Sequence, residues 1–202
     1  MKKFLLGLVL IVVGIASLML IPSKQLPAPM PWEVNTMADG NIKVFDIHLG
    51  TTTYAQAQQL VRQYGKTAIF TQDGSQPSVE AYFDSVNLGG LSAKLVLTLA
   101  VDEHVVEALL SQALDARIQD SGAHRYTLEN SSQLVNTAVK SLTYIPSIKL
   151  NSDMVKHRFG EATSIEKFAD MPESELWLYP DLGLSIHLNP NQKTIMQYHQ
   201  PQ

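Results

Sequence analysis

The sequence predicts an α+β protein with helices on one face of an antiparallel sheet. Three observations support this: an apolar N-terminal run, a helix-then-strands order that occurs twice, and strands in which apolar and polar residues alternate. The predicted order is an N-terminal transmembrane helix followed by two related units, each a helix plus an antiparallel β-meander. The expected divisions are a signal anchor at 1–24, a proline-rich spacer at 25–40, a first unit at 41–128 and a second at 129–202.

The composition excludes several classes of protein. The chain has 202 residues, a net charge of −4 and no cysteine. The negative charge and the lack of a basic patch argue against a nucleic-acid partner. The lack of cysteine excludes disulfides, thiolate catalysis and cysteine-ligated zinc.

The N-terminus predicts the location of the protein. Lys2 and Lys3 precede an uncharged apolar run at residues 4–21, which as a helix would extend for roughly 27 Å, close to the thickness of the hydrocarbon layer. We expect an uncleaved anchor that crosses the inner membrane once, with the C-terminal domain in the periplasm. A cleaved signal peptide, with its site near Gly14 and Ala16, remains the alternative. Residues 21–32 contain four prolines, which favour an extended spacer.

The first unit is expected to begin with a helix over "AQAQQLVRQYG". Thr53 and Gln56 are spaced as a capping box, and Gly65 stands where a C-terminal cap would lie. Strands are predicted near 67–71, 79–86 and 91–100. A second helix is predicted over residues 101–119, capped by Asp102 and with Ile118 on its apolar stripe, before the short strand "HRYTL".

The second unit is expected to contain a helix over 131–142 and a shorter one capped by Asn151 or Ser152 and closed by Gly160. Strands are predicted near 162–167, 175–179, 183–188 and 194–199, with turn residues between them.

Part of the sequence recurs. "GLSAKL" at 90–95 matches "GLSIHL" at 183–188, and "YG" at 64–65 matches "FG" at 159–160. The two aromatic-glycine pairs are 95 residues apart. Glu80 and Glu175 are separated by the same 95 residues, as are Tyr82 and Trp177. This order favours an internal duplication. The alternative is two generic pieces, each made of an amphipathic helix and a hairpin.

The alternation within the strands predicts a binding surface. The aliphatic side chains are expected to face the helices, which leaves aromatic and charged side chains on an open face. Aromatics among charges on a solvated sheet are typical of recognition surfaces, although such rings can also serve only as stabilising cross-strand pairs. The predicted binding residues are Tyr82, Glu80, Lys94, Trp177, Tyr179, Glu175 and His187. A cross-strand pair of Glu175 with His187 would make binding depend on pH near 6–7.

No sequence motif indicates a particular enzymatic reaction, and neither a cofactor nor a metal is expected. The sequence lacks a P-loop, G-x-S-x-G, H-E-x-x-H and a dinucleotide-binding glycine pattern. His104 and Glu107 lie one helical turn apart with Asp102 nearby, but a charged first turn of a surface helix explains them. We therefore expect a non-enzymatic, membrane-anchored binding protein whose partner is a protein or a component of the cell envelope. An envelope hydrolase using Glu80, Glu175 or His187, and a structural assembly subunit, remain alternatives.

The segments "RFGEAT" and "ELWLYPDLGLSIHL" resemble the SmpA/OmlA (BamE-like) family, in which a helix stop precedes a small meander carrying a Trp-x-Tyr pattern. In duplicated form they resemble the tandem units of β-lactamase-inhibitor-like proteins, whose concave sheet binds a partner. The resemblance covers at most about 65 residues per unit, and it implies a fold rather than a function. Glu161 and Ala162 stand where the first family often has a proline, and the lipid-bearing cysteine is absent.

Overall fold

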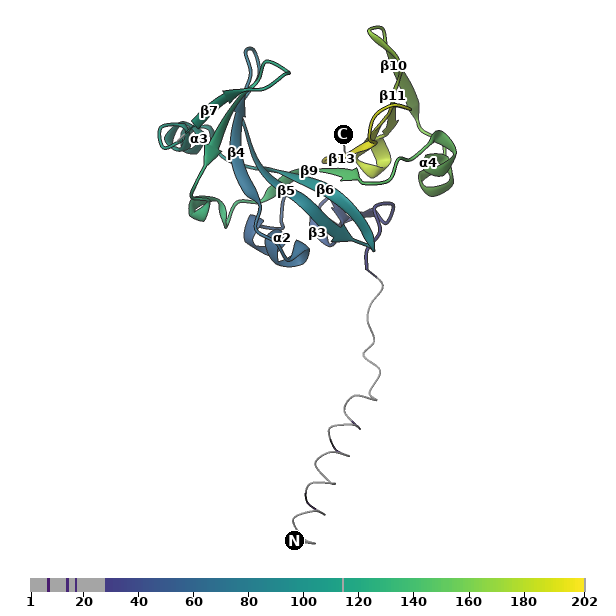
Figure 1. Cartoon of the computed structure of the whole chain (residues 1–202). Coiled ribbons are helices and arrows are strands. Elements are labelled where there is room, and N and C mark those ends of the chain that lie inside the picture. Colours follow the sequence, from purple (N-terminus) through teal and green to yellow (C-terminus); the bar gives the residue numbers. More distant parts are fainter. Residues whose placement is uncertain (1–6, 8–13, 15–16, 18–27, 114, 202) are drawn as a thin grey trace.

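The computed structural model describes residues 28–113 and 115–201, together with the isolated positions 7, 14 and 17. The fold is α+β, as predicted, with short helices and antiparallel strands. A large sheet bends into a U, and the helices lie on its outer side (Figure 1). This side is called the covered face below, and the inner, concave side is called the open face.

The large sheet contains ten strands, and every neighbouring pair is antiparallel. In spatial order they are β10 (Ser164–Phe168), β11 (Met171–Tyr179), β12 (Leu184–Leu188), β13 (Ile195–Tyr198), β9 (Val139–Pro146), β6 (Leu91–Leu99), β5 (Ser78–Leu88), β4 (Lys66–Thr71), β8 (His124–Leu128) and β7 (Asp115–Ile118). The smaller elements are the sheet of β1 (Asn35–Thr36), β2 (Ile42–Val44) and β3 (Ile47–His48), the helices α2 (Tyr54–Val61), α3 (Glu103–Leu110) and α4 (Ser152–Phe159), and the 3₁₀ turns η1 (Ser132–Leu134) and η2 (Pro180–Leu182).

The starts of α2 and α4 follow their predicted caps, whereas Asp102 precedes α3 without a side-chain capping hydrogen bond. Thr53 and Gln56 form the capping box of α2, and the Asn151 side chain accepts a hydrogen bond from the Met154 amide at the start of α4. Gly160 ends α4 with φ of 81°, which suits glycine. The end of α2 differs from the prediction, because Arg62 already adopts a left-handed conformation and Gly65 lies outside the helix.

Two predicted helices are wrong in whole or in part. The helix expected over 101–119 stops at Leu110, and its C-terminal portion forms the edge strand β7, which leaves Ile118 72% exposed. The helix expected over 131–142 is replaced by η1 and the central strand β9. Leu142, Tyr144 and Pro146 are buried at alternate positions of β9, which pairs with β6 and β13 and is rich in residues that favour strands.

The core lies on the covered face. Cross-strand neighbours form one apolar row from β5 to β11, made of Ala81, Leu97, Leu142, Tyr198, Leu184 and Tyr179. The helices and the small sheet cover this face, and the Phe45 ring lies 4.9 Å from the Tyr144 ring. The aliphatic residues of β5, β6 and β12 are buried here, as the alternation predicts.

The described part of the expected spacer is docked on the fold. Pro31 is buried, and its carbonyl accepts a hydrogen bond of 2.7 Å from the Tyr198 hydroxyl. The Arg158 guanidinium lies 4.2 Å from the centre of the Trp32 ring. Residues 28–40 are therefore not a free spacer. The expected anchor at 1–24 lies outside the described residues except at positions 7, 14 and 17, and within the described part no helix is long and apolar enough to cross a membrane.

Candidate functional site

The open face of the large sheet is the candidate recognition surface. One row of cross-strand neighbours runs across it from β4 to β10, and it consists of Lys66, Tyr82, Val96, Thr143, Gln197, Ser185, Leu178 and Ser164. Helices α2, α3 and α4 all lie on the other side of the sheet (Figure 1). The row has a cation and a ring at one end, polar side chains in the middle, and one aliphatic residue toward each end, Val96 and Leu178.

A charged network surrounds Tyr82 at the first end of this row. The Tyr82 hydroxyl donates a hydrogen bond of 2.9 Å to Asp84, and the ammonium groups of Lys66 and Lys94 each lie 3.7 Å from the same carboxylate. The Lys94 ammonium also lies 5.7 Å from the centre of the Tyr82 ring. The Tyr82 hydrogen bond, helped by the two lysines, lowers the pKa of Asp84. Tyr82 and Lys94 thus lie on the open face, as predicted.

Glu80 lies beside this network in a shallow cavity of about 370 Å³ that also includes Gln119 and Arg125. The Ser78 hydroxyl donates a hydrogen bond of 3.1 Å to its carboxylate. Partial burial nevertheless raises the pKa of Glu80, and the Ser78 hydrogen bond offsets only part of this effect. The face predicted for Glu80 is correct, but its carboxylate is less solvated than the sequence suggested.

The prediction that Trp177 and Tyr179 lie on the open face is wrong, because they are only 2% and 4% exposed on the covered face. Their polar atoms are satisfied there. The Trp177 indole donates a hydrogen bond of 2.9 Å to Glu175, and the Tyr179 hydroxyl donates one of 3.1 Å to the Gly160 carbonyl. The Phe159 ring of α4 lies 5.9 Å from the Tyr179 ring. These contacts remove the polar penalty that would favour an exposed position.

The expected pair of Glu175 and His187 does not form. Glu175 lies opposite Leu188 and contacts Lys167 at 3.3 Å, whereas His187 lies opposite Leu176 on the open face. The His187 ring instead packs edge-on against Phe168, with 5.7 Å between ring centres. The pH dependence expected from a Glu175–His187 contact therefore has no structural basis.

The two parts of the sequence repeat behave differently. Lys94 and His187 occupy matching places in "GLSAKL" and "GLSIHL", and both lie on the open face. By contrast, Tyr82 and Trp177, which are related by the 95-residue spacing, lie on opposite faces of the sheet. The strand register includes a bulge between Phe83 and Val86, which a fixed spacing does not accommodate. The internal duplication stays a prediction. The proposed match of Glu80 and Tyr82 with Glu175 and Trp177 is no longer part of it.

The three groups considered for hydrolysis are separated. Glu80 lies in the cavity with Arg125, whereas Glu175 lies in another, of about 510 Å³, with Glu173 and Lys149. His187 lines neither of these cavities. Within the described ranges, no cluster of three acidic or histidine side chains could hold a metal ion. No described cavity thus combines two of the groups that the hydrolase hypothesis requires.

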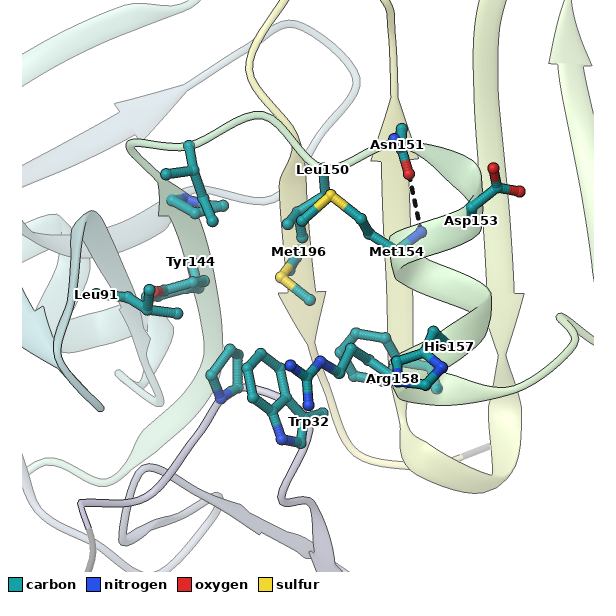
Figure 2. A pocket seen from close by; sticks show the side chains of 14 residues that line it. Trp32, Leu91, Tyr144, Leu150, Asn151, Asp153, Met154, His157, Arg158 and Met196 are labelled. Atoms are coloured by element: carbon teal, nitrogen blue, oxygen red, sulfur yellow. Dashed lines mark hydrogen bonds between the residues drawn. The ribbon is translucent and has the colours of Figure 1, made fainter.

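One cavity was not anticipated from the sequence. It has a volume of about 450 Å³ and lies on the covered face between α4, β9, β13 and the docked segment that contains Trp32 (Figure 2). Tyr144 forms part of its wall, and among the described residues its buried hydroxyl has no hydrogen-bond partner. This cavity was not predicted, because residues 131–142 were expected to form a helix and residues 25–40 a free spacer. The alternation of Leu142, Tyr144 and Pro146 was the available signal.

Comparison with protein-family models, with curated proteins and with solved structures finds no match for this chain.

Proposed function

We propose that this chain is a non-enzymatic binding protein of the cell envelope that recognises a protein or envelope component through the open face. A single-pass anchor at residues 1–24 would hold it at the inner membrane, with the folded part in the periplasm. Lys2, Lys3 and the apolar run that follows them support this location.

One observation carries the proposal. The row from Lys66 to Ser164 spans eight strands of a concave sheet, and every described helix lies on the opposite side (Figure 1). A continuous concave surface of this kind can contact a convex partner along many side chains at once. Its centre is polar, while Tyr82 and Lys94 supply a ring and a charge for specific contacts.

The test is site-specific photocrosslinking in intact cells. A benzophenone amino acid placed at Tyr82, Thr143 or Leu178 should give the same discrete adduct, because these positions share one row on the open face. The matched control is Leu60, which is 43% exposed on α2 on the covered side. The same adduct from Leu60, or none from the three open-face positions, would overturn the proposal.

A second measurement separates recognition from folding. Tyr82→Ala with Lys94→Ala should reduce the yield of adduct from Thr143 at least tenfold while far-UV circular dichroism stays unchanged, because both side chains are partly exposed. Substitution of Trp177 and Tyr179 is not an adequate test of binding, since both rings are buried. An undiminished yield would show that the ring and the charge are not contact residues.

A further inference from the structure

We propose that the cavity beneath α4 binds a single acyl chain joined to an anionic, oxygen-containing head. A free fatty acid and a lysophospholipid share this chemistry. The site is independent of the proposed function, because it lies on the covered face and involves no residue of the open-face row.

The walls of the cavity suit a hydrocarbon chain. The volume of about 450 Å³ lies within the range of small-molecule sites. The apolar wall residues come from separate parts of the chain, and they include Leu91, Pro146, Ile148, Leu150, Met154 and Met196. Figure 2 shows them around a common space, with Leu91 on one side and Leu150, Met154 and Met196 on another. The two methionines make this wall adaptable to chains of different length.

The Tyr144 hydroxyl indicates that the ligand also carries a hydrogen-bond acceptor. Tyr144 has no exposed surface, and its hydroxyl is the buried side-chain atom left without a partner among the described residues. Buried hydroxyls are normally hydrogen-bonded, because an unpaired one loses its hydration without compensation. A carbonyl or carboxylate oxygen at the head of an acyl chain would accept this hydrogen bond once the adaptable side chains around the hydroxyl shift to admit it.

Two basic side chains favour an anionic head. Arg158 and His157 lie in the last turn of α4 and line the cavity beside Trp32 (Figure 2). Arg158 stacks on Trp32 and, within the described ranges, forms no ion pair with a carboxylate. Asp153, the acidic wall residue, lies at the other end of α4. The guanidinium is therefore available to a carboxylate or phosphate.

The test uses the full chain held in an amphipathic polymer, because detergent alkyl chains would compete for the cavity. The probe is cis-parinaric acid, a polyene fatty acid that accepts excitation energy from tryptophan, and Trp32 in the cavity wall is the donor. We expect saturable energy transfer in the wild-type chain. Tyr144→Phe and Arg158→Gln should each raise the dissociation constant about fivefold or more, because each removes one hydrogen-bonding group from the ligand.

A matched pair of substitutions controls for nonspecific insertion. Met154 lines the cavity and is 42% exposed, whereas Met171 is 45% exposed and does not line it. Met154→Glu should weaken binding of the probe at least tenfold, and Met171→Glu should leave it unchanged. Equal affinity in the two variants, or transfer that does not saturate, would overturn the proposal.

Competition then identifies the source of the acyl chain. Displacement of the probe by oleate but not by lysophosphatidylglycerol assigns the site to fatty acids, and the reverse result assigns it to lysophospholipids. Oleyl alcohol, which lacks an anionic head, should compete at least tenfold less well than the better of the two. If oleyl alcohol competes equally, or if neither anionic lipid displaces the probe, the proposed ligand class is wrong.

Discussion

The two meanders of the large sheet share the pattern Gly-Leu-Ser-x-x-Leu but present different side chains to the open face. In β4–β6, the charged and aromatic side chains Glu80 and Tyr82 face the concave side, and aliphatic residues are covered. In β11, Trp177 and Tyr179 are covered, and Leu176 and Leu178 take the open side. Alternation therefore determines which side chains share a face, but it does not determine which face is buried.

The difference follows from the surroundings of the polar atoms. The indole of Trp177 and the hydroxyl of Tyr179 both find acceptors on the covered side, at Glu175 and Gly160. With the polar atoms satisfied, the larger apolar area of the two rings favours their burial over that of Leu176 and Leu178. The Tyr82 hydroxyl has its partner on the open side, at Asp84.

The largest expected effect contrasts one aromatic residue from each meander. Trp177→Ala should lower the free energy of unfolding by about 3–5 kcal/mol, because it leaves a cavity in the core. Tyr82→Ala should lower it by about 1 kcal/mol or less, since the ring lies on a partly solvated face. Urea denaturation followed by circular dichroism measures both. Equal losses in the two variants would contradict the assignment of Trp177 to the covered face and Tyr82 to the open face.

Several features set by neighbouring residues were predicted correctly from the sequence, although the end of α2 was not. The capping box of Thr53 and Gln56, the Asn151 cap and the positive φ of Gly160 depend on contacts within one or two turns. The alternation in β5 and β6 likewise follows from the strand period alone. These local rules were sufficient for the α+β class and for the open-face positions of Glu80, Tyr82, Lys94 and His187.

Features set by distant residues were not predicted. The helix predicted over 131–142 ran into the first residues of strand β9, whose central place in the sheet depends on β6 and β13 pairing with it on both sides. Trp177 is buried because α4 and Glu175 surround it, and no periodicity in β11 carries that information. The cavity beneath α4 needs Trp32, Tyr144 and Met196 together, although they are far apart in sequence.

The second prediction compares a satisfied hydroxyl with an unsatisfied one. Tyr179→Phe should lower the free energy of unfolding by about 1 kcal/mol, because the Gly160 carbonyl loses its hydrogen-bond donor. Tyr144→Phe should instead raise it by about 1 kcal/mol in the unliganded protein, because it removes a buried hydroxyl that has no described partner. Thermal denaturation compares the two variants. A loss of stability in Tyr144→Phe would show that this hydroxyl is satisfied.

Alkaline pH gives an independent readout of the same residue. Burial raises the pKa of Tyr144 to about 12. The unfolded chain ionises near pH 10 while the folded one keeps its proton, so stability is full below pH 10 and falls as the pH rises toward 12. Tyr144→Phe should make this decline shallower without abolishing it, because burial also raises the pKa of Tyr198. An unchanged slope would contradict the burial of the Tyr144 hydroxyl.

The third prediction is that the two glutamates respond in opposite directions to the same substitution. Burial raises the pKa of Glu80, so its contribution to stability is lost as the pH rises above the ordinary value of 4.5 through the raised pKa. The Trp177 hydrogen bond, helped by Lys167, lowers the pKa of Glu175, so its contribution is present above pH 4.5 and is lost as the pH falls through the lowered pKa.

At pH 7, Glu80→Gln should therefore raise the free energy of unfolding and Glu175→Gln should lower it, each by less than about 1 kcal/mol. The difference between the two variants should disappear in acid, where both carboxylates are protonated. Urea midpoints measured from pH 3 to pH 7 test this. Changes of the same sign at neutral pH would mean that the two glutamates do not differ in environment as the structure indicates.

The smallest effects are expected for the lysines that pair with the acids of the two meanders. Lys167 lies 3.3 Å from Glu175, whose other oxygen holds the Trp177 indole, whereas Lys94 lies 3.7 Å from the more exposed Asp84. Lys167→Met should lower the free energy of unfolding by about 0.5 kcal/mol, because the pair is partly exposed. Lys94→Met should have a still smaller effect on stability. Both effects should vanish in 1 M salt, where exposed charges are screened. If Lys94→Met lowered stability more than Lys167→Met, Lys94 would be a residue that stabilises the fold. Its proposed role as a contact residue of the open face would then be contradicted.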